Sequence, residues 1–592
     1  MPQDKKFYIT TPIYYGNGLP HVGHFYSSTI ANILFKYHKI SGVSSRFTTG
    51  IDENSQKAVI KAQEADMGVM EYLDYMAVEH QKTWDYFNLD YTDFIRTTSP
   101  RHHSLVQEVL QHCYDKGDIY QDYYSGKYCI GCEAYKKDDE LIPHPNPLLR
   151  GEGASSQLVC ADHLTVPELL KEKNYFFKLT RYQTWIEEFY DTNPDFVLPH
   201  FRYNEVKAFV GRGLEDFSIS RETNTFGIPL PFDTSQVTYV WFDALFNYYT
   251  SCKYSPKPHH NSSPQGEDEA ALGDTQEYWS HFQDESKLFW ESDDVTKVHI
   301  VGKDIIRFHA IFWPAMLASY FDLGEMGEDG KLHYKDSDRE KLPTTILTGG
   351  YFTVDGQKMS KSLGNVIDPI AYSKEYSKEL LGLYILSAFP IGNDGDYSRD
   401  DAIKTYNAKL ANNLGNLVNR VVVLSLKLSE NSGILKPRGL RSDDNIEGFS
   451  LDHPLAVKYG KYAVKIGQNI ESESRGFQSS MKDFDLKFTL DCVFRLLDSL
   501  NKFADETQPW QMIKTDEEGT REVLYTLAEG LRQVGLALYP FFPEKMSEMF
   551  EKLGLKDYAK QLEAGKLHDL LQREEMFVIL EKGEALFKRI EV

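Results

Sequence analysis

The sequence predicts an α/β domain built on a parallel sheet, followed by an all-α domain. Two observations carry this prediction. Near the start, an apolar strand, a helix and a second apolar strand follow one another, which is the order of a parallel α/β unit. From about residue 400 onward, apolar residues recur at helical spacing, which is typical of a helical bundle. A chain of 592 residues has room for about three to five domains.

The elements follow from local composition. Residues 7–11 are aromatic and β-branched, which suits a buried strand, and 15–20 have turn chemistry. A helix is predicted from His21, with Gly42 as its stop, and a second strand at 45–49 leads into 50–53. Apolar stripes predict further helices at 455–470, 490–500 and 523–538, and segments rich in Pro, Gly and Ser predict loop insertions near 141–156 and 253–275.

Composition excludes several classes of protein. Hydrophobic residues make up 41% of the chain, so it is not disordered, and no apolar run reaches the length of a spanning helix. Six cysteines are too few for a disulfide scaffold, and the first residues lack the apolar core of a secretory signal, so we expect a cytoplasmic protein without membrane contact. The net charge of −23 excludes a surface that is basic throughout, but not a local basic stripe.

Residues 21–24, with the sequence His-Val-Gly-His, lie at the turn from a strand into a helix. The start of a helix presents N–H groups and a partial positive charge, which attract phosphate. Two imidazoles can add hydrogen bonds to a phosphoryl transition state, and the intervening glycine allows a nucleotide to approach the backbone. Alone, the pattern is also compatible with two ordinary histidines.

Residues 358–362, with the sequence Lys-Met-Ser-Lys-Ser, form a second motif, which Gly356 and Gly364 bracket as hinges. Two lysines on a loop of small residues make a mobile cationic clamp for a polyphosphate. Taken alone, such a loop is usually only solvated.

Together, these motifs match the class I aminoacyl-tRNA synthetases in order and in placement after strands. The segments 11–15, 239–244, 302–309, 312–317 and 508–510 further resemble the methionyl-tRNA synthetase family, over essentially the whole chain except the two insertions. The resemblance implies a Rossmann-like parallel-sheet catalytic domain with a zinc-knuckle connective insert, followed by an all-α anticodon-binding bundle. The implied boundaries are 1–115 and 226–345 for the catalytic halves, 116–225 for the insert, 346–400 for the junction domain with the Lys-Met-Ser-Lys-Ser loop, and 401–592 for the bundle.

The resemblance implies a two-step reaction. Methionine and MgATP give methionyl-adenylate and pyrophosphate, and the methionyl group then passes to the terminal adenosine of tRNA(Met). The methionine carboxylate needs no activating base, so catalysis is alignment and charge stabilisation at the α-phosphate. The implied catalytic residues are His21, His24, Lys358, Lys361 and Arg221; Asn17, Gly23, Gly302 and Asp304, together with His24 and Lys361, are the implied ATP ligands.

The methionine pocket also follows from the resemblance. Asp52 is the expected partner of the α-ammonium, and His309 or Tyr15 is expected to offer a weak donor to the sulfur. The implied pocket consists of Ile13, Tyr15, Asp52, Trp241, Ala244, Leu245, Tyr248, Ile305 and His309. After Asp52 the chain departs from the family, which commonly has a histidine and a glycine where this sequence has Asn54 and Ser55.

Two knuckles predict a structural zinc site. Cys129 and Cys132 form the first, and Cys160 and His163 form the second, after a gap of 27 residues that contains the first insertion. This donor set and spacing are typical of tetrahedral zinc, and the longer loop adds little cost. The alternative is a knuckle that has lost its metal. Similar synthetases carry a zinc knuckle in this insert.

Recognition of tRNA is expected in the helical part. Residues 401–441 contain seven basic and two acidic residues, a local charge of +5 that suits a phosphate backbone. Asn416, Arg420 and Trp510 match family positions that contact the anticodon, with Trp510 as a stacking surface. The family's appended C-terminal domain is missing, so we expect a monomer.

Three alternatives remain open from the sequence. Another class I synthetase, such as the cysteine enzyme, would need a metal in its amino-acid pocket. A non-catalytic RNA-binding relative would be favoured by the loss of either phosphate motif, and both are intact. A stand-alone nucleotidyltransferase would be shorter and would lack the helical part.

Overall fold

The structure, a computed structural model, describes most of the chain. Both predicted insertions lie largely outside the described part, as do Cys132, His163 and Lys361. The described residues are 6–129, 134–136, 138, 141–143, 158–161, 165–222, 224, 226–257, 274–354, 356–359, 366–428, 433–435, 464–573, 575–579 and 581–591.

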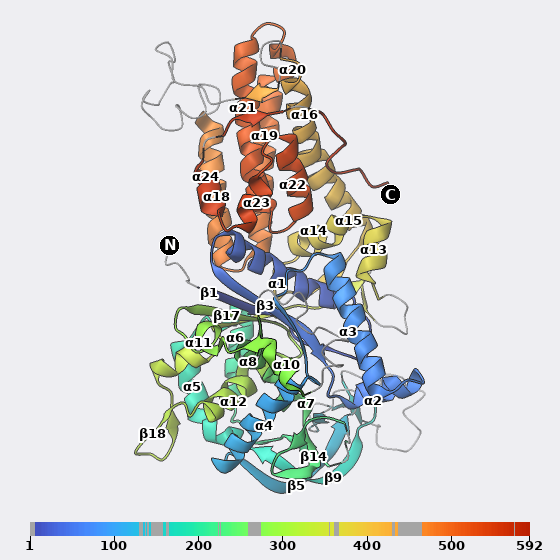
Figure 1. Cartoon of the computed structure of the whole chain (residues 1–592), viewed down its shortest axis with the longest axis vertical. Helices are drawn as coiled ribbons and strands as arrows, with labels where there is room; N and C mark the ends of the chain where they lie inside the picture. Colours follow the sequence, from blue (N-terminus) through green and yellow to red (C-terminus); the bar gives the residue numbers. More distant parts are fainter. Residues whose placement is uncertain are drawn as a thin grey trace.

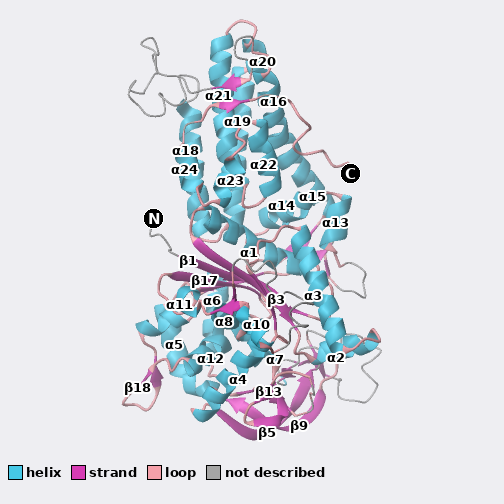
Figure 2. Ribbon diagram, viewed as in Figure 1, coloured by secondary structure: helices cyan, strands magenta, loops and turns pink. Residues whose placement is uncertain are grey.

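A seven-stranded sheet forms the centre of the catalytic half (Figures 1 and 2). Its strands run in the order β10-β20-β17-β1-β3-β2, with β4 also paired to β3, and every pairing is parallel, as predicted. The strand order reverses at β1, so a crevice is expected there at the carboxyl ends. The strands are β1 (Lys6–Thr10), β2 (Tyr14–Tyr15), β3 (Ser44–Asp52), β4 (Asp93–Arg96), β10 (Val197–Leu198), β17 (Val295–Gly302) and β20 (Thr345–Gly349).

Alternating side chains give the sheet two buried faces. On β1, Phe7 and Ile9 join one hydrophobic cluster, and Tyr8 joins the other. Helix α1 (Val22–Ile40) covers the first face and lies between the sheet and the helical domain in Figure 1. It ends as predicted, because Gly42 takes a φ of +80° that favours glycine. The second face is packed by α4 (Pro100–Asp115), α8 (Asn247–Lys253) and α12 (Trp313–Tyr320).

Two smaller sheets follow α4 in the connective region, at the end of the molecule remote from the helical domain (Figure 1). The first has the order β11-β9-β5-β6, dominated by the long pair β5 (Ile119–Cys129) and β9 (Glu168–Phe177), with β11 (Phe217–Ser218) and β6 (Ala134–Lys136) at its edges. The second joins β12 (Ser220–Arg221) to β14 (Asp233–Thr238), which leads directly into α7 (Val240–Leu245).

The C-terminal part is a helical bundle, as predicted. The apolar stripes at 490–500 and 523–538 fall within α19 (Leu486–Thr507) and α21 (Glu517–Leu538). Of the stripe predicted at 455–470, Ile466 and Ile470 fall within α18 (Val464–Lys482), and 455–463 lie outside the described residues. One continuous hydrophobic cluster runs from α1 through α14 (Lys378–Ala388) into these helices. The other helices of the bundle and its approach are α13 (Pro369–Glu375), α15 (Arg399–Tyr406), the π-helix Asn407–Gly415, α16 (Asn416–Ser425), α20 (Pro509–Met512), α22 (Pro543–Lys552), α23 (Tyr558–Glu563) and α24 (Leu567–Gln572).

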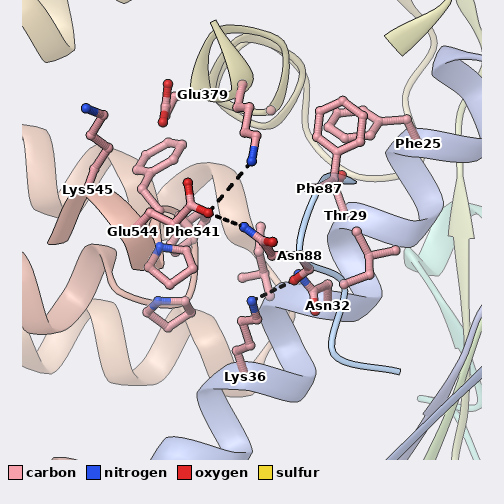
Figure 3. Close-up of a pocket in the computed structure, with 17 residues that line it drawn as sticks. Phe25, Thr29, Asn32, Lys36, Phe87, Asn88, Glu379, Phe541, Glu544 and Lys545 are labelled. Carbon is pink, nitrogen blue, oxygen red and sulfur yellow. Dashed lines mark hydrogen bonds and ion pairs between the residues drawn. The ribbon is translucent and has the colours of Figure 1, made fainter. Parts of the chain in front are cut away.

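Polar contacts also join the catalytic half to the helical bundle (Figure 3). Asn88 donates to Glu544 at 2.6 Å, and Lys378 lies 3.7 Å from the same carboxylate. The Lys36 ammonium, which is almost fully buried on α1, donates to the Asn88 carbonyl at 2.9 Å. Since α1 begins at the crevice, the bundle is packed against the far end of the helix that carries the His-Val-Gly-His motif.

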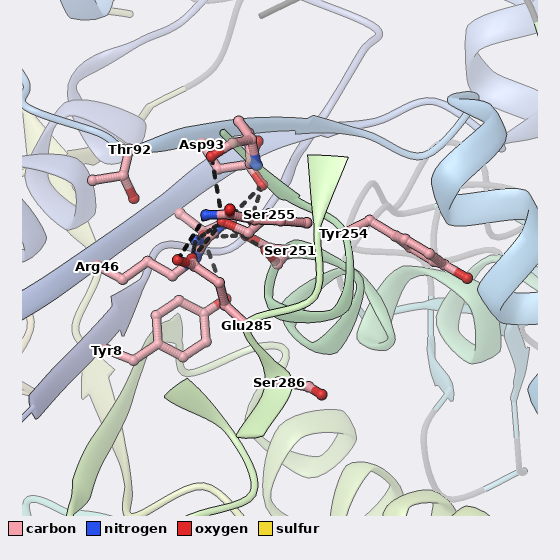
Figure 4. A network of polar contacts seen from close by, with 12 residues as sticks. Tyr8, Arg46, Thr92, Asp93, Ser251, Tyr254, Ser255, Glu285 and Ser286 are labelled. Carbon is pink, nitrogen blue, oxygen red and sulfur yellow. Dashed lines mark hydrogen bonds and ion pairs between the residues drawn. The ribbon is translucent and has the colours of Figure 1, made fainter. Parts of the chain in front are cut away.

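A buried charge network connects the sheet to its second helical layer (Figure 4). Asp93 on β4 accepts two hydrogen bonds from Arg101 at 2.8 and 2.9 Å and one from Ser251 at 2.7 Å. Arg46 on β3 completes it, contacting Asp93 at 3.4 Å and Glu285 at 3.0 Å. Because each buried charge has partners of opposite sign, the network fixes the packing of α4 and α8 on the strands.

Candidate active site

The predicted motifs meet at one edge of the central sheet. The turn after β1 leads into α1, β3 ends at Asp52, β17 ends at Gly302 and β20 ends at Gly349. Gly302 and Gly349 are neighbours in the strand register, as are Tyr15 and Asp52. Since the carboxyl ends of parallel strands share one edge, segments far apart in the sequence meet around β1, where a sheet of this kind is expected to bind its ligand in a crevice.

The two histidines of residues 21–24 form a stacked pair. Their ring centroids are 3.8 Å apart, and His21 caps α1, because its Nδ1 accepts a hydrogen bond from the Gly23 amide at 3.0 Å. With Nδ1 accepting, the His21 proton lies on Nε2, where it can be donated to a ligand. A side chain at Gly23 would place its Cβ 2.9 Å from the His21 ring, so glycine is required here.

The sequence predicts that the first two backbone amides of α1 face phosphate, but in the structure both bond within the protein. The Val22 amide donates to the Ile367 carbonyl at 3.1 Å, and the Gly23 amide is held by His21. In this arrangement both donors are occupied, so hydrogen bonding to phosphate falls mainly to side chains. The Val22–Ile367 bond also ties the residues after the Lys-Met-Ser-Lys-Ser loop to the start of α1, which brings the two phosphate motifs together.

The second motif is only partly described. The backbone of Lys358 lies in β22 (Gln357–Lys358), which pairs with β21 (Phe352–Val354); its side chain and Lys361 lie outside the described residues. Gly356 turns between these strands with a φ of +75°, which favours glycine, whereas Gly364 is not described. The loop therefore leaves from this hairpin and returns to α1 at Ile367.

Asp52 is buried at the end of β3, with 4% of its surface exposed. It lies beside Tyr15, and its carbonyl accepts from the Gly16 amide at 2.8 Å. The buried ion pair that follows it was not predicted from the sequence. The next residue, Glu53, is fully buried and bonds to Arg96, which also contacts Asp74 at 2.6 Å. The signal was available as an acidic residue and an arginine at the ends of two adjacent strands, but the pairing itself was not.

The predicted aromatic wall is assembled around His309. The Trp241 ring lies 6.2 Å from His309, edge to face, and the Tyr248 hydroxyl is 2.7 Å from His309 Nε2. His309 Nδ1 faces the Ile305 carbonyl at 3.0 Å, so Nδ1 is the donor and Nε2 accepts from Tyr248. Burial lowers the pKa of His309 to about 4 and keeps it neutral. Both nitrogens are occupied, so the expectation that His309 donates to the methionine sulfur is not met in this arrangement.

The remaining predicted residues occupy several elements near the crevice. Arg221 on β12 donates to Ser218 and to the Ser220 carbonyl and stacks on Tyr239, two residues before Trp241. This places it beside the predicted methionine pocket. A Cβ at Gly302 would lie 2.5 Å from Asp304 Oδ1, so a larger residue here would displace the exposed Asp304 carboxylate. Ala244 and Leu245 are buried on α7, Ile13, Asn17 and Ile305 are partly exposed, and Asp304 is exposed.

Two of the four predicted zinc ligands are described. Cys129 ends β5 and Cys160 ends β8 (Leu158–Cys160), and both are buried. Cys129 Sγ lies 3.7 Å from Thr165 Oγ1, and the Cys160 amide donates to the Thr165 carbonyl, so the two described cysteines contact the same residue. This convergence of soft donors fits zinc. Within the described residues no group of three or more potential ligands is found, since Cys132 and His163 are not among them.

The predicted anticodon residues gather on the bundle. Arg420 on α16 lies over the Trp510 ring at 5.6 Å and contacts Asp505 at 3.2 Å. Asn416 is exposed at the start of the same helix, one turn away. The preceding segment is a π-helix, a distortion that is often found at functional sites.

In the described part of the chain, no helix has the length and apolarity needed to cross a membrane.

This fold and crevice are those expected of a class I aminoacyl-tRNA synthetase. A family model described as tRNA synthetases class I (M) matches residues 7–422. The methionine–tRNA ligase of Fusobacterium nucleatum is 34% identical over 93% of this chain and 75% of its own length. That of Thermosynechococcus vestitus is also 34% identical, over 93% of this chain and 90% of its own length.

Solved structures agree. The methionyl-tRNA synthetase of Mycobacterium tuberculosis in complex with methionyl-adenylate superposes with a TM-score of 0.79 at 27% identity, covering 99% of this chain and all of that chain. The chain therefore belongs to the class I tRNA synthetases of the methionine family. The family resemblance is confirmed, as is the predicted parallel-sheet α/β domain followed by a helical domain; the predicted zinc knuckle stays a prediction.

Proposed function

We propose that this chain is a methionine–tRNA ligase that forms methionyl-adenylate from methionine and ATP and transfers the methionyl group to tRNA(Met). The observation that carries the proposal is the meeting of β1, β3, β17 and β20 at one sheet edge, where the histidine pair, Asp52 and two glycine-ended strands line the same crevice. The family's members that match over most of their length carry this activity in their names.

In the first step, the methionine carboxylate attacks the α-phosphorus of ATP, and pyrophosphate leaves. Asp52 holds the α-ammonium, and the wall of Trp241, Tyr248 and His309 encloses the thioether, whose sulfur gains about 0.3–1.5 kcal/mol from each favourable aromatic contact. Each substrate group is thereby held in line before reaction. The other pocket residues are Ile13, Tyr15, Ala244, Leu245 and Ile305.

Charge stabilisation comes from the two phosphate motifs. His21 and His24 donate to oxygens of the α-phosphate, and Lys358 and Lys361 neutralise the departing pyrophosphate together with Mg²⁺. Arg221 stabilises the reacting groups from the side of the methionine pocket. Asn17, Gly23, Gly302 and Asp304 line the adenosine. The His21 Nε2 proton, fixed by the Gly23 amide, supports this role.

The test is ATP–pyrophosphate exchange that depends on an added amino acid, with each of the twenty amino acids assayed separately. Exchange with methionine alone, followed by charging of tRNA(Met), is expected. Exchange with none of them, by folded protein with zinc present, would refute the catalytic function and favour an RNA-binding relative.

Recognition of tRNA belongs to the same proposal. Arg420, Asn416 and Trp510 contact the anticodon, with Trp510 as the stacking surface. Arg420→Ala should weaken charging of tRNA(Met) while leaving pyrophosphate exchange unchanged, because the site lies on the bundle. Equal loss in both assays would place Arg420 in the catalytic machinery instead.

A structural zinc ion held by Cys129, Cys132, Cys160 and His163 completes the proposal, with a monomer acting in the cytosol. Zinc would stabilise the insert by fixing the two knuckles, whose described cysteines both contact Thr165. Elemental analysis should give one zinc per chain, and Cys160→Ser should abolish it. Light scattering should give the mass of one 68.2 kDa chain.

A further inference from the structure

We infer that His80, a residue of α3 (Val69–Tyr86) to which nothing above assigns a role, is the positioning residue of the phosphate-binding turn. The inference rests on the proposed function and extends it. His80 Nε2 lies 3.1 Å from the Gly18 carbonyl, 62 residues earlier in the chain. Since a carbonyl only accepts, Nε2 carries the proton and donates it.

The turn between β2 and α1 is held at three points. Its beginning is tied to the sheet by the bond from the Gly16 amide to the Asp52 carbonyl. Its end is tied to the segment after the Lys-Met-Ser-Lys-Ser loop through Val22 and Ile367. Its middle is tied to α3 by His80. The first two ties join backbone groups, so of the three only the His80 contact is made by a side chain and can be removed by substitution.

The surroundings of His80 fix it in place. Its side chain is fully buried, and its ring packs at 6.1 Å against Tyr14 and at 6.1 Å against His24. Trp84, one turn further along α3, meets it edge to face. The Tyr14 hydroxyl in turn bonds to Ser27 and Ser28 on α1. His80 therefore contacts both the turn, through Gly18, and the ring of His24.

The ring acts as a neutral donor. Burial, with a smaller effect from the nearby His21, lowers the pKa of His80 to about 4, and the Gly18 bond opposes the shift. Protonation is thus not part of its role. Without the bond, the Gly18 carbonyl loses its partner, and the turn that leads into His21 gains freedom. Displacement of catalytic groups by about 1 Å can cost about 100-fold in rate.

The test compares three variants in ATP–pyrophosphate exchange. His80→Leu, which fills the space without a donor, should lower kcat by about 10- to 100-fold while the KM for methionine stays within about twofold. His80→Gln, whose amide nitrogen reaches the position of Nε2, should restore most of the rate, and His80→Asn, whose amide is shorter, should not. The pH dependence of kcat should be the same for His80→Gln and the native chain.

Met76→Ala is the matched control, because Met76 is buried on α3 one turn before His80 but packs against Ala62 and Tyr72. It should lower the thermal midpoint while leaving kcat nearly unchanged. If His80→Leu keeps the native kcat, or if Met76→Ala loses as much, the positioning role is refuted while the proposed function stands. If the native chain shows no methionine-dependent exchange, the proposed function itself fails.

Discussion

Arg96→Met should destabilise the catalytic domain, because it breaks the buried ion pair between Arg96 and Glu53, next to Asp52. The Arg96 side chain is 3% exposed and contacts Glu53, which is fully buried, through Nε at 2.9 Å and Nη2 at 2.7 Å. Among the described residues, removing the guanidinium leaves the Glu53 carboxylate with Thr98 alone, which donates from its amide at 3.2 Å and from its hydroxyl at 2.5 Å. Breaking a buried pair from one side costs about 3–5 kcal/mol, so a loss of this size is expected for the catalytic domain.

Urea unfolding followed by tryptophan fluorescence measures this loss, and exchange kinetics measure the effect on the site. The KM for methionine should rise, because Asp52 directly precedes Glu53. The double variant Arg96→Met/Glu53→Gln should regain much of the stability, since no uncompensated charge remains. Arg475→Met is the control, because Arg475 is 75% exposed and its pair with Glu471 spans 4.0 Å; such a change usually costs less than about 0.5 kcal/mol. If Arg96→Met unfolds at the same urea concentration as this control, the buried Arg96–Glu53 pair does not stabilise the catalytic domain, and the reasoning is refuted.

Three further predictions follow from the geometry. Gly23→Ala would place a Cβ 2.9 Å from the His21 ring and should lower kcat by about 10- to 100-fold with an unchanged KM for methionine; a native kcat would contradict the assigned role of His21. Tyr248→Phe should cost about 1–3 kcal/mol in urea unfolding, because it leaves the buried His309 Nε2 without its donor. Stability should fall as the pH drops from 6.5 towards 4, because His80 and His309 have pKa values of about 4 in the fold against 6.5 when unfolded, a gap worth roughly 3 kcal/mol per histidine. Thermal midpoints that stay constant over this range would contradict the buried neutral state.

The sequence was most informative where local chemistry decides structure. The first strand, the helix from residue 21 to Gly42 and the second strand are all found, because apolar periodicity and a glycine stop act within a few residues. The stripes at 490–500 and 523–538 were equally reliable, since each marks the buried face of a long helix.

Contacts between distant segments could not be predicted in this way. The bond from Val22 to Ile367 joins residues 345 positions apart, and it occupies an amide that was expected to face phosphate. The bond between Tyr248 and His309 likewise spans 61 positions and decides which His309 nitrogen carries a proton. Hydrogen-bond partners of this kind depend on tertiary packing, which periodicity and motif spacing do not encode.

Asn54 and Ser55, where the sequence departs from the family, are both held in place by hydrogen bonds to the backbone. The Asn54 amide donates to the Thr97 carbonyl at 3.0 Å, and the Glu53 amide donates to the Thr97 hydroxyl at 2.9 Å. Ser55 caps α2 (Gln56–Glu64) by accepting from the Ala58 amide. Both replacements are nearly fully buried and act on the backbone. Asn54 and Glu53 therefore anchor the turn after Asp52 to the end of β4, and Ser55 begins α2, although the family's usual histidine and glycine are absent.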